Sequence, residues 1–263
     1  MTETSKRQHS FAVCAYGDSP YLEECILSLR HQTAASEIFI STSTPSEFIY
    51  RIARLYSLPV FLSHGGGIGS DWNAALSHAQ TPYVTIAHQD DVYLKNYTEI
   101  ILNAFDRDPR GMIAFTDYRE IYNGKVISEN LNLKIKELML LPLRADGNSR
   151  FSKRAAIAFG NAICCPAVAY NTGMIGDFQF GQDMRSNIDW AAWETLSKKN
   201  GSFLYCPEPA VLHRIHSESE TSNMIGGNLR HDEDLEIFRR FWPRPLAGLI
   251  SSFYKNSEKG NIK

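Results

Sequence analysis

Two adjacent aspartates, Asp90 and Asp91, directly follow a short apolar segment at residues 83–87. This segment is rich in β-branched residues and is preceded by a proline, so it predicts a buried strand. Neighbouring carboxylates at a strand end repel each other and lose water, whereas a divalent cation would hold both. Hard oxygen ligands favour Mg²⁺ or Mn²⁺ over zinc. The alternative is a helix N-cap, for which Asp is a favoured residue.

A second acidic residue, Asp189, opens a predicted helix at residues 188–199. It is a candidate general base for removing a proton from a hydroxyl group. Apolar surroundings provided by Trp190 and Trp193 would raise the pKa of its carboxyl group. The alternative is again that the aspartate only caps the helix.

The segment His213-Arg214-Ile215-His216, which we call the basic tetrad, lies at the end of a predicted strand at residues 210–213. If the strand is regular, Arg214 and His216 share one face and His213 points to the other. His216 is then a candidate third metal ligand, and Arg214 a candidate for holding phosphate. The alternative is that these are polar residues of a surface loop.

The first 105 residues alternate strand and helix patterns four times, with short connections. This order predicts an α/β fold with a parallel sheet, in which ligands bind at the carboxyl ends of the strands. The strands are expected at residues 10–15, 37–40, 60–62 and 83–87, and the helices at 21–31, 47–56, 71–79 and 94–105. A Gly-rich turn at residues 64–70 matches neither dinucleotide-binding nor P-loop spacing.

The second half is less regular. The sequence Asn123-Gly124 predicts a hairpin within residues 118–127. We expect an irregular segment and a mobile lid over residues 130–150, and a loop over 174–187. Short strands are expected at residues 112–115, 203–206 and 210–213, and helices at 154–159 and 233–242.

Composition excludes several classes of protein. A formal charge of −2 over 263 residues provides no basic field, so nucleic acid is not an expected partner. No apolar run approaches the ~20 residues needed to span a membrane, and the polar N-terminus lacks the apolar core of a signal peptide. The five cysteines have no metal-binding spacing and read as reduced thiols, so we expect a cytoplasmic protein without structural zinc.

Five motifs in order together resemble the inverting family 2 glycosyltransferases of the GT-A fold. They are FAVCAYGDSPYLEECILSL at residues 11–29, GGGIGSDWNAAL at 65–76, HQDD at 88–91, NIDWAAWETL at 187–196 and RIHSESETS at 214–222. The resemblance covers residues 10–91 and 163–222. It implies a Rossmann-like, mostly parallel sheet with helices on both faces and a C-terminal acceptor-side region.

The resemblance also implies roles for single residues. Asp91 resembles the direct metal ligand, His216 a residue near the metal and diphosphate, and Asp189 the catalytic base. The residues expected to bind the nucleotide-sugar are Ala15, Tyr16, Thr42, Asn73, Asp90 and Arg214.

Two positions depart from the family's usual pattern. The loop after the second strand, residues 41–44, is Ser-Thr-Ser-Thr where an acidic residue is usual. Trp72 stands where an arginine usually precedes Asn73. The donor nucleotide therefore stays unassigned. Two alternatives remain open: a catalytically silent nucleotide- or glycan-binding protein of the same fold, and a sugar-nucleotidyltransferase. The second is disfavoured because residues 16–19 contain no Arg or Lys.

The predicted function is transfer of a sugar from a metal-bound nucleotide-sugar to an acceptor hydroxyl with inversion, in polysaccharide or glycoconjugate biosynthesis. The resemblance implies a glycan, lipid-linked or protein acceptor. We expect residues 1–117 to bind the donor, 118–228 to bind the acceptor, and 229–263 to form a helical tail. The tail mixes bulky apolar and basic residues, and we expect a helix packed on the domain with a polar end. The alternative is contact with a membrane surface, at its inner face.

Overall fold

The computed structural model describes residues 8–216 and 228–260. Residues 217–227, which contain the whole Ser/Thr-rich part of the RIHSESETS motif, lie outside the described residues. The polar N-terminal residues 1–7 also lie outside them.

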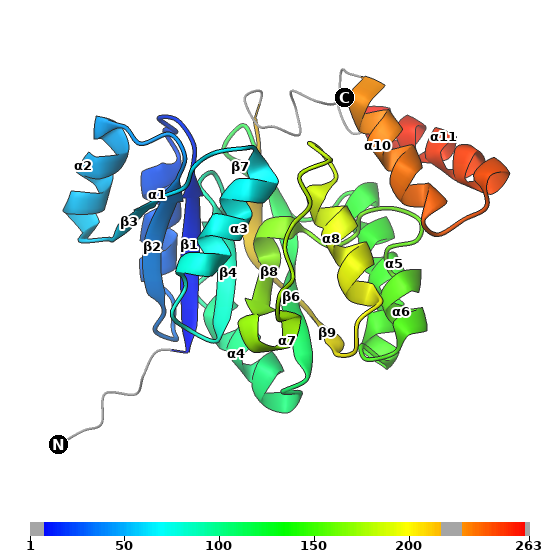
Figure 1. Cartoon of the computed structure of the whole chain (residues 1–263), viewed down its shortest axis with the longest axis horizontal. Coiled ribbons are helices and arrows are strands. Elements are labelled where there is room, and N and C mark those ends of the chain that lie inside the picture. Colours follow the sequence, from blue (N-terminus) through cyan, green and yellow to red (C-terminus); the bar gives the residue numbers. More distant parts are fainter. Residues whose placement is uncertain (1–7, 217–227, 261–263) are drawn as a thin grey trace.

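The first half of the chain forms the parallel sheet that the sequence predicts (Figure 1). Strands β1 (His9–Ala15), β2 (Glu37–Thr42), β3 (Val60–Leu62) and β4 (Tyr83–His88) lie in the order β3-β2-β1-β4, all parallel. Helices α1 (Leu22–Arg30), α2 (Glu47–Tyr56) and α3 (Ile68–His78) connect them. The loops after β1, β2, β3 and β4 therefore meet at one edge of the sheet.

The second half extends this sheet with mixed pairing. Strand β8 (Val168–Asn171) is antiparallel to both β4 and β6 (Gly111–Tyr122), so β6 again runs parallel to β4. Strand β9 (Ser202–Ile215) is parallel to β6, and the short β5 (Val92–Tyr93) is antiparallel to β9. The prediction of a mostly parallel sheet thus holds for strands β1 to β4 and only roughly for the whole sheet.

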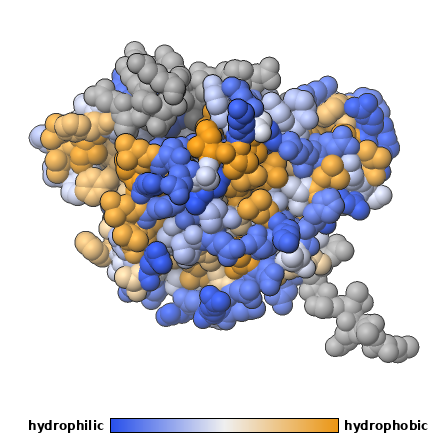
Figure 2. Space-filling model, turned by 180° about the vertical axis from the view of Figure 1, so that it is seen from behind, coloured by the Kyte–Doolittle hydropathy of each residue, from blue (hydrophilic) through white to orange (hydrophobic). Residues whose placement is uncertain are grey.

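Helices cover both faces of the sheet. On one face, α1, α2 and α4 (Tyr97–Arg107) bury apolar side chains against β1, β2 and β4. On the other face, α3, α5 (Leu131–Ala145), α8 (Ile188–Ser197), α10 (Asn228–Arg239) and α11 (Arg244–Gly260) pack in a second core around Trp190 and Trp193. Hydrophobic residues also remain on the outside of the molecule (Figure 2).

Three local predictions were wrong. Residues 130–150 are mostly helical, because the side chain of Asn130 caps α5 by accepting a hydrogen bond from the Leu133 N–H. The strands predicted at 203–206 and 210–213 are one strand, β9, whose register against β6 shifts between Thr116 and Tyr118. The predicted helix at 154–159 lies earlier, as α6 (Arg150–Ala155).

Smaller elements complete the chain. The predicted hairpin is present: Asn123 and Gly124 both have positive φ and join β6 to β7 (Lys125–Ile127). A single 3₁₀ turn (Cys165–Ala167) precedes β8, and α7 (Thr172–Ile175) follows it.

Gly69, in the first turn of α3, lets this helix approach the loop before α8. A Cβ at this position would overlap the carbonyl oxygen of Gly181, whereas a Cβ at Gly248 in α11 would meet nothing within 4 Å. We predict that Gly69→Ala destabilises the fold by about 1–3 kcal/mol. Gly248→Ala should stabilise it slightly, because alanine is the better helix former.

Urea unfolding of both variants measures these free energies. A Gly69→Ala variant as stable as the unchanged chain would contradict the close packing of α3 on this loop.

Candidate active site

The ends of β1 and β2 form the left part of the candidate site in Figure 1. Ala15 pairs with Thr42 across the two strands. The backbone of the next residue, Tyr16, is held from both sides by Gln89: its N–H donates to Gln89 Oε1 at 3.1 Å, and its carbonyl accepts from Gln89 Nε2 at 2.8 Å. The Tyr16 ring is exposed. Gln89 therefore ties the predicted nucleotide-binding residues to the turn that carries the two aspartates.

The Ser-Thr-Ser-Thr loop after β2 is organised by its own hydroxyl groups. Thr42 is buried, and its Oγ1 accepts from the Thr44 N–H at 3.1 Å. Thr44 Oγ1 in turn accepts from the Gly17 N–H at 2.8 Å. The Ser43 hydroxyl donates to Asp71 of α3, so this loop is joined to the helix that follows the Gly-rich turn.

The turn after β4 places the aspartate pair at the centre of the same edge. Strand β5 follows directly, and α4 does not begin until Tyr97. The alternative that Asp90 or Asp91 caps this helix is therefore excluded. Asp91 is fully buried and Asp90 is half-buried.

The two oxygens of Asp91 differ sharply in their contacts. Oδ1 lies 2.9 Å from His213 Nδ1 and accepts from the Arg214 N–H at 2.8 Å. Oδ2 is buried and has no hydrogen-bond partner. A buried carboxylate oxygen without a partner is costly and calls for an explanation such as a bound ion.

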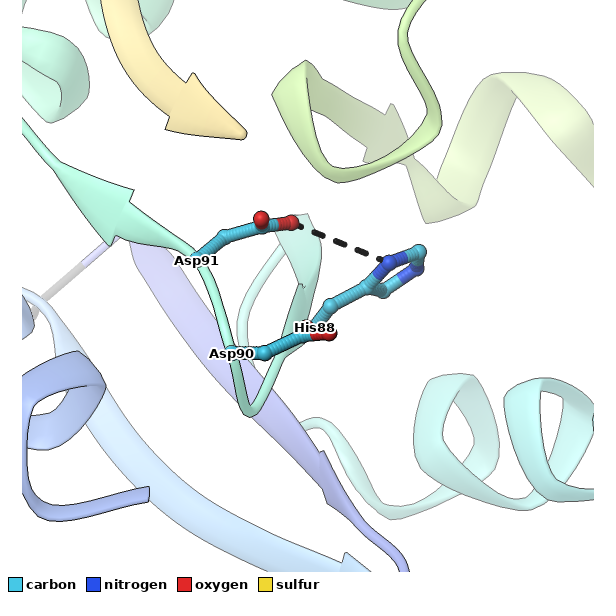
Figure 3. Close-up of side chains that lie close together, drawn as sticks. All are labelled: His88, Asp90 and Asp91. Atoms are coloured by element: carbon cyan, nitrogen blue, oxygen red, sulfur yellow. Dashed lines mark ion pairs between the residues drawn. The ribbon is translucent and has the colours of Figure 1, made fainter. Parts of the chain in front are cut away.

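His88, the last residue of β4, faces this oxygen. Its Nδ1 lies 3.9 Å from Asp91 Oδ2, and the two side chains are directed toward each other (Figure 3). This separation is too long for a hydrogen bond. It suits two ligands of one cation, each at roughly 2.1 Å from it. Within the described residues, His88, Asp90 and Asp91 form a group whose possible ligand atoms all lie within 4.8 Å of one another.

Sequence reasoning singled out the aspartates of HQDD and missed His88, the first residue of the same motif, because only the folded structure directs its ring toward Asp91 Oδ2. Its ring stacks on Trp72, with ring centres 5.5 Å apart and planes 18° apart. Trp72 is the residue that stands where the family usually has arginine. The tryptophan at position 72 therefore replaces the positive charge of the usual arginine with a ring that packs against the His88 imidazole.

The basic tetrad lies beside the aspartates, as the sequence predicts. Arg214 stacks on Tyr21 at 4.4 Å and His216 lies against the same ring, whereas His213 lies near Tyr118. The predicted division of the strand into two faces is therefore confirmed.

The contacts of these residues are specific. Arg214 donates from Nε to the Asp90 carbonyl and from an Nη to Glu24, so much of its guanidinium is already engaged. His216 Nε2 lies 2.9 Å from Asp90 Oδ2. A phosphate contact of Arg214 and a metal bond of His216 stay predictions.

Asp189 lies in the first turn of α8, after the N-cap residue Asn187. Its Oδ2 accepts from Asn161 Nδ2 at 2.7 Å, and its Oδ1 accepts from the Trp190 N–H. Burial beside the fully buried Trp190 raises the pKa of the Asp189 carboxyl, and the Asn161 hydrogen bond offsets part of this rise. The expected direction of the pKa is therefore confirmed. His88 and Asp189 are close enough for their charges to interact.

The start of α8 is held by the C-terminal helix α10. The buried carboxylate of Glu233 accepts from the N–H groups of Arg185, Ser186 and Asn187 at 2.7–3.0 Å. Asp234 accepts from the Asn187 side chain. Residues 229–263 therefore support the element that carries Asp189.

The side-chain amide of Asn73 forms two hydrogen bonds, both to the backbone of Phe180. Its Nδ2 donates to the Phe180 carbonyl at 3.0 Å, and its Oδ1 accepts from the Phe180 N–H at 2.7 Å. In this structure Asn73 fixes the loop between α7 and α8 against α3. Its predicted contact with the nucleotide-sugar has no direct support from this geometry and stays a prediction.

Charge explains how Asp91 tolerates burial. Burial alone would raise its pKa, but the charge and hydrogen bond of His213 bring it below its ordinary value. For His213, burial lowers the pKa, but Asp91 raises it more, to about 9. The pair is therefore ionic at neutral pH.

The His213–Asp91 pair makes the stability of the metal-free protein depend on pH. Because the folded pKa of His213 exceeds its unfolded value near 6.5, its contribution is complete below pH 6.5 and is lost as pH rises through about 9. We predict that the free energy of unfolding in a chelator falls by up to about 3 kcal/mol over this window.

His213→Gln should flatten that pH dependence in chemical unfolding measured at pH 6.5 and 9. An equal fall in the variant would show that another group is responsible.

Comparison with known proteins defines the class of this chain. Several solved glycosyltransferase structures share the fold of this chain at 10–17% sequence identity. TarS 1–349 of S. aureus with UDP-GlcNAc aligns at a TM-score of 0.61 and 15% identity, over 93% of this chain and 70% of that one. The mannosyltransferase PcManGT of Pyrobaculum calidifontis with GDP-Man and Mn²⁺ aligns at 0.64 and 14%, over 95% and 70%. Glucosyl-3-phosphoglycerate synthase of Mycobacterium tuberculosis aligns at 0.60 and 10%, over 90% and 80%.

The chain spans 42% of the longer TarS structure. A search of curated proteins finds no match. Residues 10–170 match the family described as glycosyl transferase family 2. The chain therefore belongs to glycosyl transferase family 2 and has the GT-A fold of the solved glycosyltransferases.

Proposed function

We propose that this glycosyltransferase binds a nucleotide-diphosphate-sugar through Mn²⁺ or Mg²⁺ and transfers the sugar to a hydroxyl with inversion. The observation that carries the proposal is the buried, unpartnered Oδ2 of Asp91 facing His88, at the carboxyl edge of the sheet. Asp90, half-buried in the same turn, supplies a second carboxylate and so a third candidate ligand. In PcManGT, a protein of the same fold, the bound species are GDP-Man and Mn²⁺.

The donor would lie along the ends of β1, β2 and β4. Tyr16 and Thr42 would border the nucleobase of the donor. The hydrogen bonds from Gln89 would keep the Tyr16 backbone in position beside it. Asp91 and His88, with Asp90, would hold the cation, and we retain His216 as a further candidate through its contact with Asp90. Such a cation would neutralise the departing diphosphate.

Asp189 is the proposed general base. Its carboxylate would accept the proton of the acceptor hydroxyl while that oxygen attacks the anomeric carbon opposite the diphosphate, so inversion follows from one displacement. A raised pKa brings a carboxylate closer to the pKa suited to this task. Asn161 would keep the carboxylate oriented toward the acceptor.

For the donor and the acceptor, we propose chemical classes. The related structures hold UDP-GlcNAc and GDP-Man, so we propose a UDP- or GDP-linked sugar as donor. We propose a glycan, lipid-linked or protein acceptor in polysaccharide or glycoconjugate biosynthesis, at the cytoplasmic side of a membrane. Among the described residues no helix is both long and apolar enough to cross a membrane.

The three parts of the chain keep their proposed roles with one refinement. Residues 1–117 would bind the donor and 118–228 the acceptor. Residues 229–263 would act with the acceptor half, because α10 holds the start of α8 through Glu233.

Removing the proposed metal ligand tests nucleotide binding. We predict that UDP or GDP raises the melting temperature only with Mn²⁺, and that Asp91→Asn abolishes this rise. His88→Ala should weaken it, because one ligand of three is lost. Asp106→Asn, the same substitution at an exposed carboxylate of α4, is the matched control.

The measurement is a thermal-shift titration of UDP and GDP with and without Mn²⁺. A metal-dependent rise that survives in Asp91→Asn would refute the assignment of this carboxylate.

Removing the proposed base tests the chemical step. We predict that Asp189→Asn lowers kcat by roughly 10²–10⁴-fold while leaving metal-dependent nucleotide binding intact. Because the base must be ionised, kcat/KM should fall as pH drops through the raised pKa of Asp189. Asn161→Ala removes the hydrogen bond that lowers this pKa, so the acidic limb should move to higher pH.

The pH dependence of initial rates for the three proteins measures this limb. If Asp189→Asn retained near-normal kcat, the base would have to be another residue.

A further inference from the structure

Exposed apolar side chains gather at the end of the molecule formed by α5, α6 and α11. Within the described residues, nine of the fifteen exposed large hydrophobic side chains belong to these helices or to the segment after α6. They are Leu131, Ile135, Leu138, Leu141, Phe151, Phe159, Leu246, Leu249 and Phe253, which we call the apolar end. Seen from behind Figure 1, hydrophobic residues gather along the left margin, over this end (Figure 2).

Helix α5 is apolar on two opposite sides. Leu133, Leu140 and Leu143 are buried in the cores. Leu131, Ile135, Leu138 and Leu141 recur every three or four residues and are 44–75% exposed. An ordinary surface helix turns charged or polar residues to solvent on this side. Exposed apolar side chains gathered along one side of a helix are typical of a surface for contact.

Helix α11 repeats the pattern. Its side chains Leu246, Leu249 and Phe253 are 40–68% exposed, whereas Ala247 is buried and Tyr254 packs on Trp190. The two stripes belong to one end of the molecule. Trp242, before α11, donates to the Ala158 carbonyl and lies against Phe159, and the Tyr254 ring covers Gly160.

The charge around these stripes is positive. Residues 131–155 contain six Lys or Arg against two acidic residues, and residues 244–255 contain two against none, in a chain whose net charge is −2. Three of these cations do not add to the surface charge, because Lys153 is buried, Lys136 donates to the Tyr118 hydroxyl and Arg154 pairs with Glu194. Arg144, Arg150 and Arg244 are exposed. Leucine and phenylalanine stripes with flanking cations fit an anionic lipid surface, where apolar groups enter the interface and cations meet phosphate headgroups. A second copy would bring like charges together, which disfavours self-association.

We propose that the apolar end is a peripheral binding site for anionic membranes. Helices α5 and α11 lie on the lipid surface with their outer stripes inserted between headgroups, and Arg144, Arg150 and Arg244 contact phosphates. This binding does not depend on the proposed transferase chemistry, because none of its residues contacts the aspartates or Asp189.

Vesicle flotation of the full chain tests the proposal. We expect the protein to float with vesicles of phosphatidylcholine containing 30% phosphatidylglycerol, and to bind pure phosphatidylcholine roughly tenfold or more weakly. The triple variant Leu138→Gln/Leu249→Gln/Phe253→Gln should lose flotation. Arg144→Glu/Arg150→Glu/Arg244→Glu should lower binding to the anionic vesicles at least tenfold and leave weak binding to neutral vesicles unchanged.

The matched control is Leu55→Gln/Leu62→Gln, which changes two equally exposed leucines on α2 and β3 at the opposite end of the sheet. It should float like the unchanged chain, and circular dichroism should show all variants folded. Absence of flotation on anionic vesicles would overturn the proposal, as would equal loss in the control. A dimer in sedimentation that the triple variant dissolves, without lipid binding, would assign the apolar end to a second copy instead.

Discussion

The structure depends on keeping one carboxylate, that of Asp91, ionised and buried at the carboxyl end of β4. Such a charge is stable only when each oxygen has a partner. His213 and the Arg214 N–H serve Oδ1, and Oδ2 remains directed at His88. The protein thus stabilises the charge at Oδ1 with its own groups, and Oδ2 is the atom that a bound cation would stabilise. A cation at this point would also attract the diphosphate of a donor.

The surrounding elements are arranged to hold that carboxylate and its neighbours still. The long strand β9 returns beside β6 and carries His213, Arg214 and His216 to the aspartates, although they are more than 120 residues away in sequence. The C-terminal helix α10 fixes the start of α8 through Glu233 and so positions Asp189. The positions of the proposed catalytic residues therefore depend on segments that the sequence pattern presents as a loop and a tail.

Much of this was predictable, and the failures have physical causes. Alternating strand and helix patterns placed the parallel half of the sheet, and the HQDD spacing placed Asp91 at its edge. Helix α5 was mistaken for a lid because Pro142 lies inside it and because apolar residues on two opposite sides of the helix hide the helical period. His88 was missed because its proposed role depends on the burial and orientation of Asp91 Oδ2, which appear only in the folded structure. That Asn73 binds the Phe180 backbone is a tertiary contact that no local pattern encodes.

The central claim is that the aspartate turn carries metal-dependent sugar transfer rather than silent nucleotide binding. The most direct measurement is release of nucleoside diphosphate from a panel of UDP- and GDP-sugars, with Mn²⁺ and with chelator. The account predicts release from one nucleotide class, dependent on Mn²⁺ and absent in Asp91→Asn. Release that is equally fast in chelator, or none from any donor despite metal-dependent binding, would contradict it.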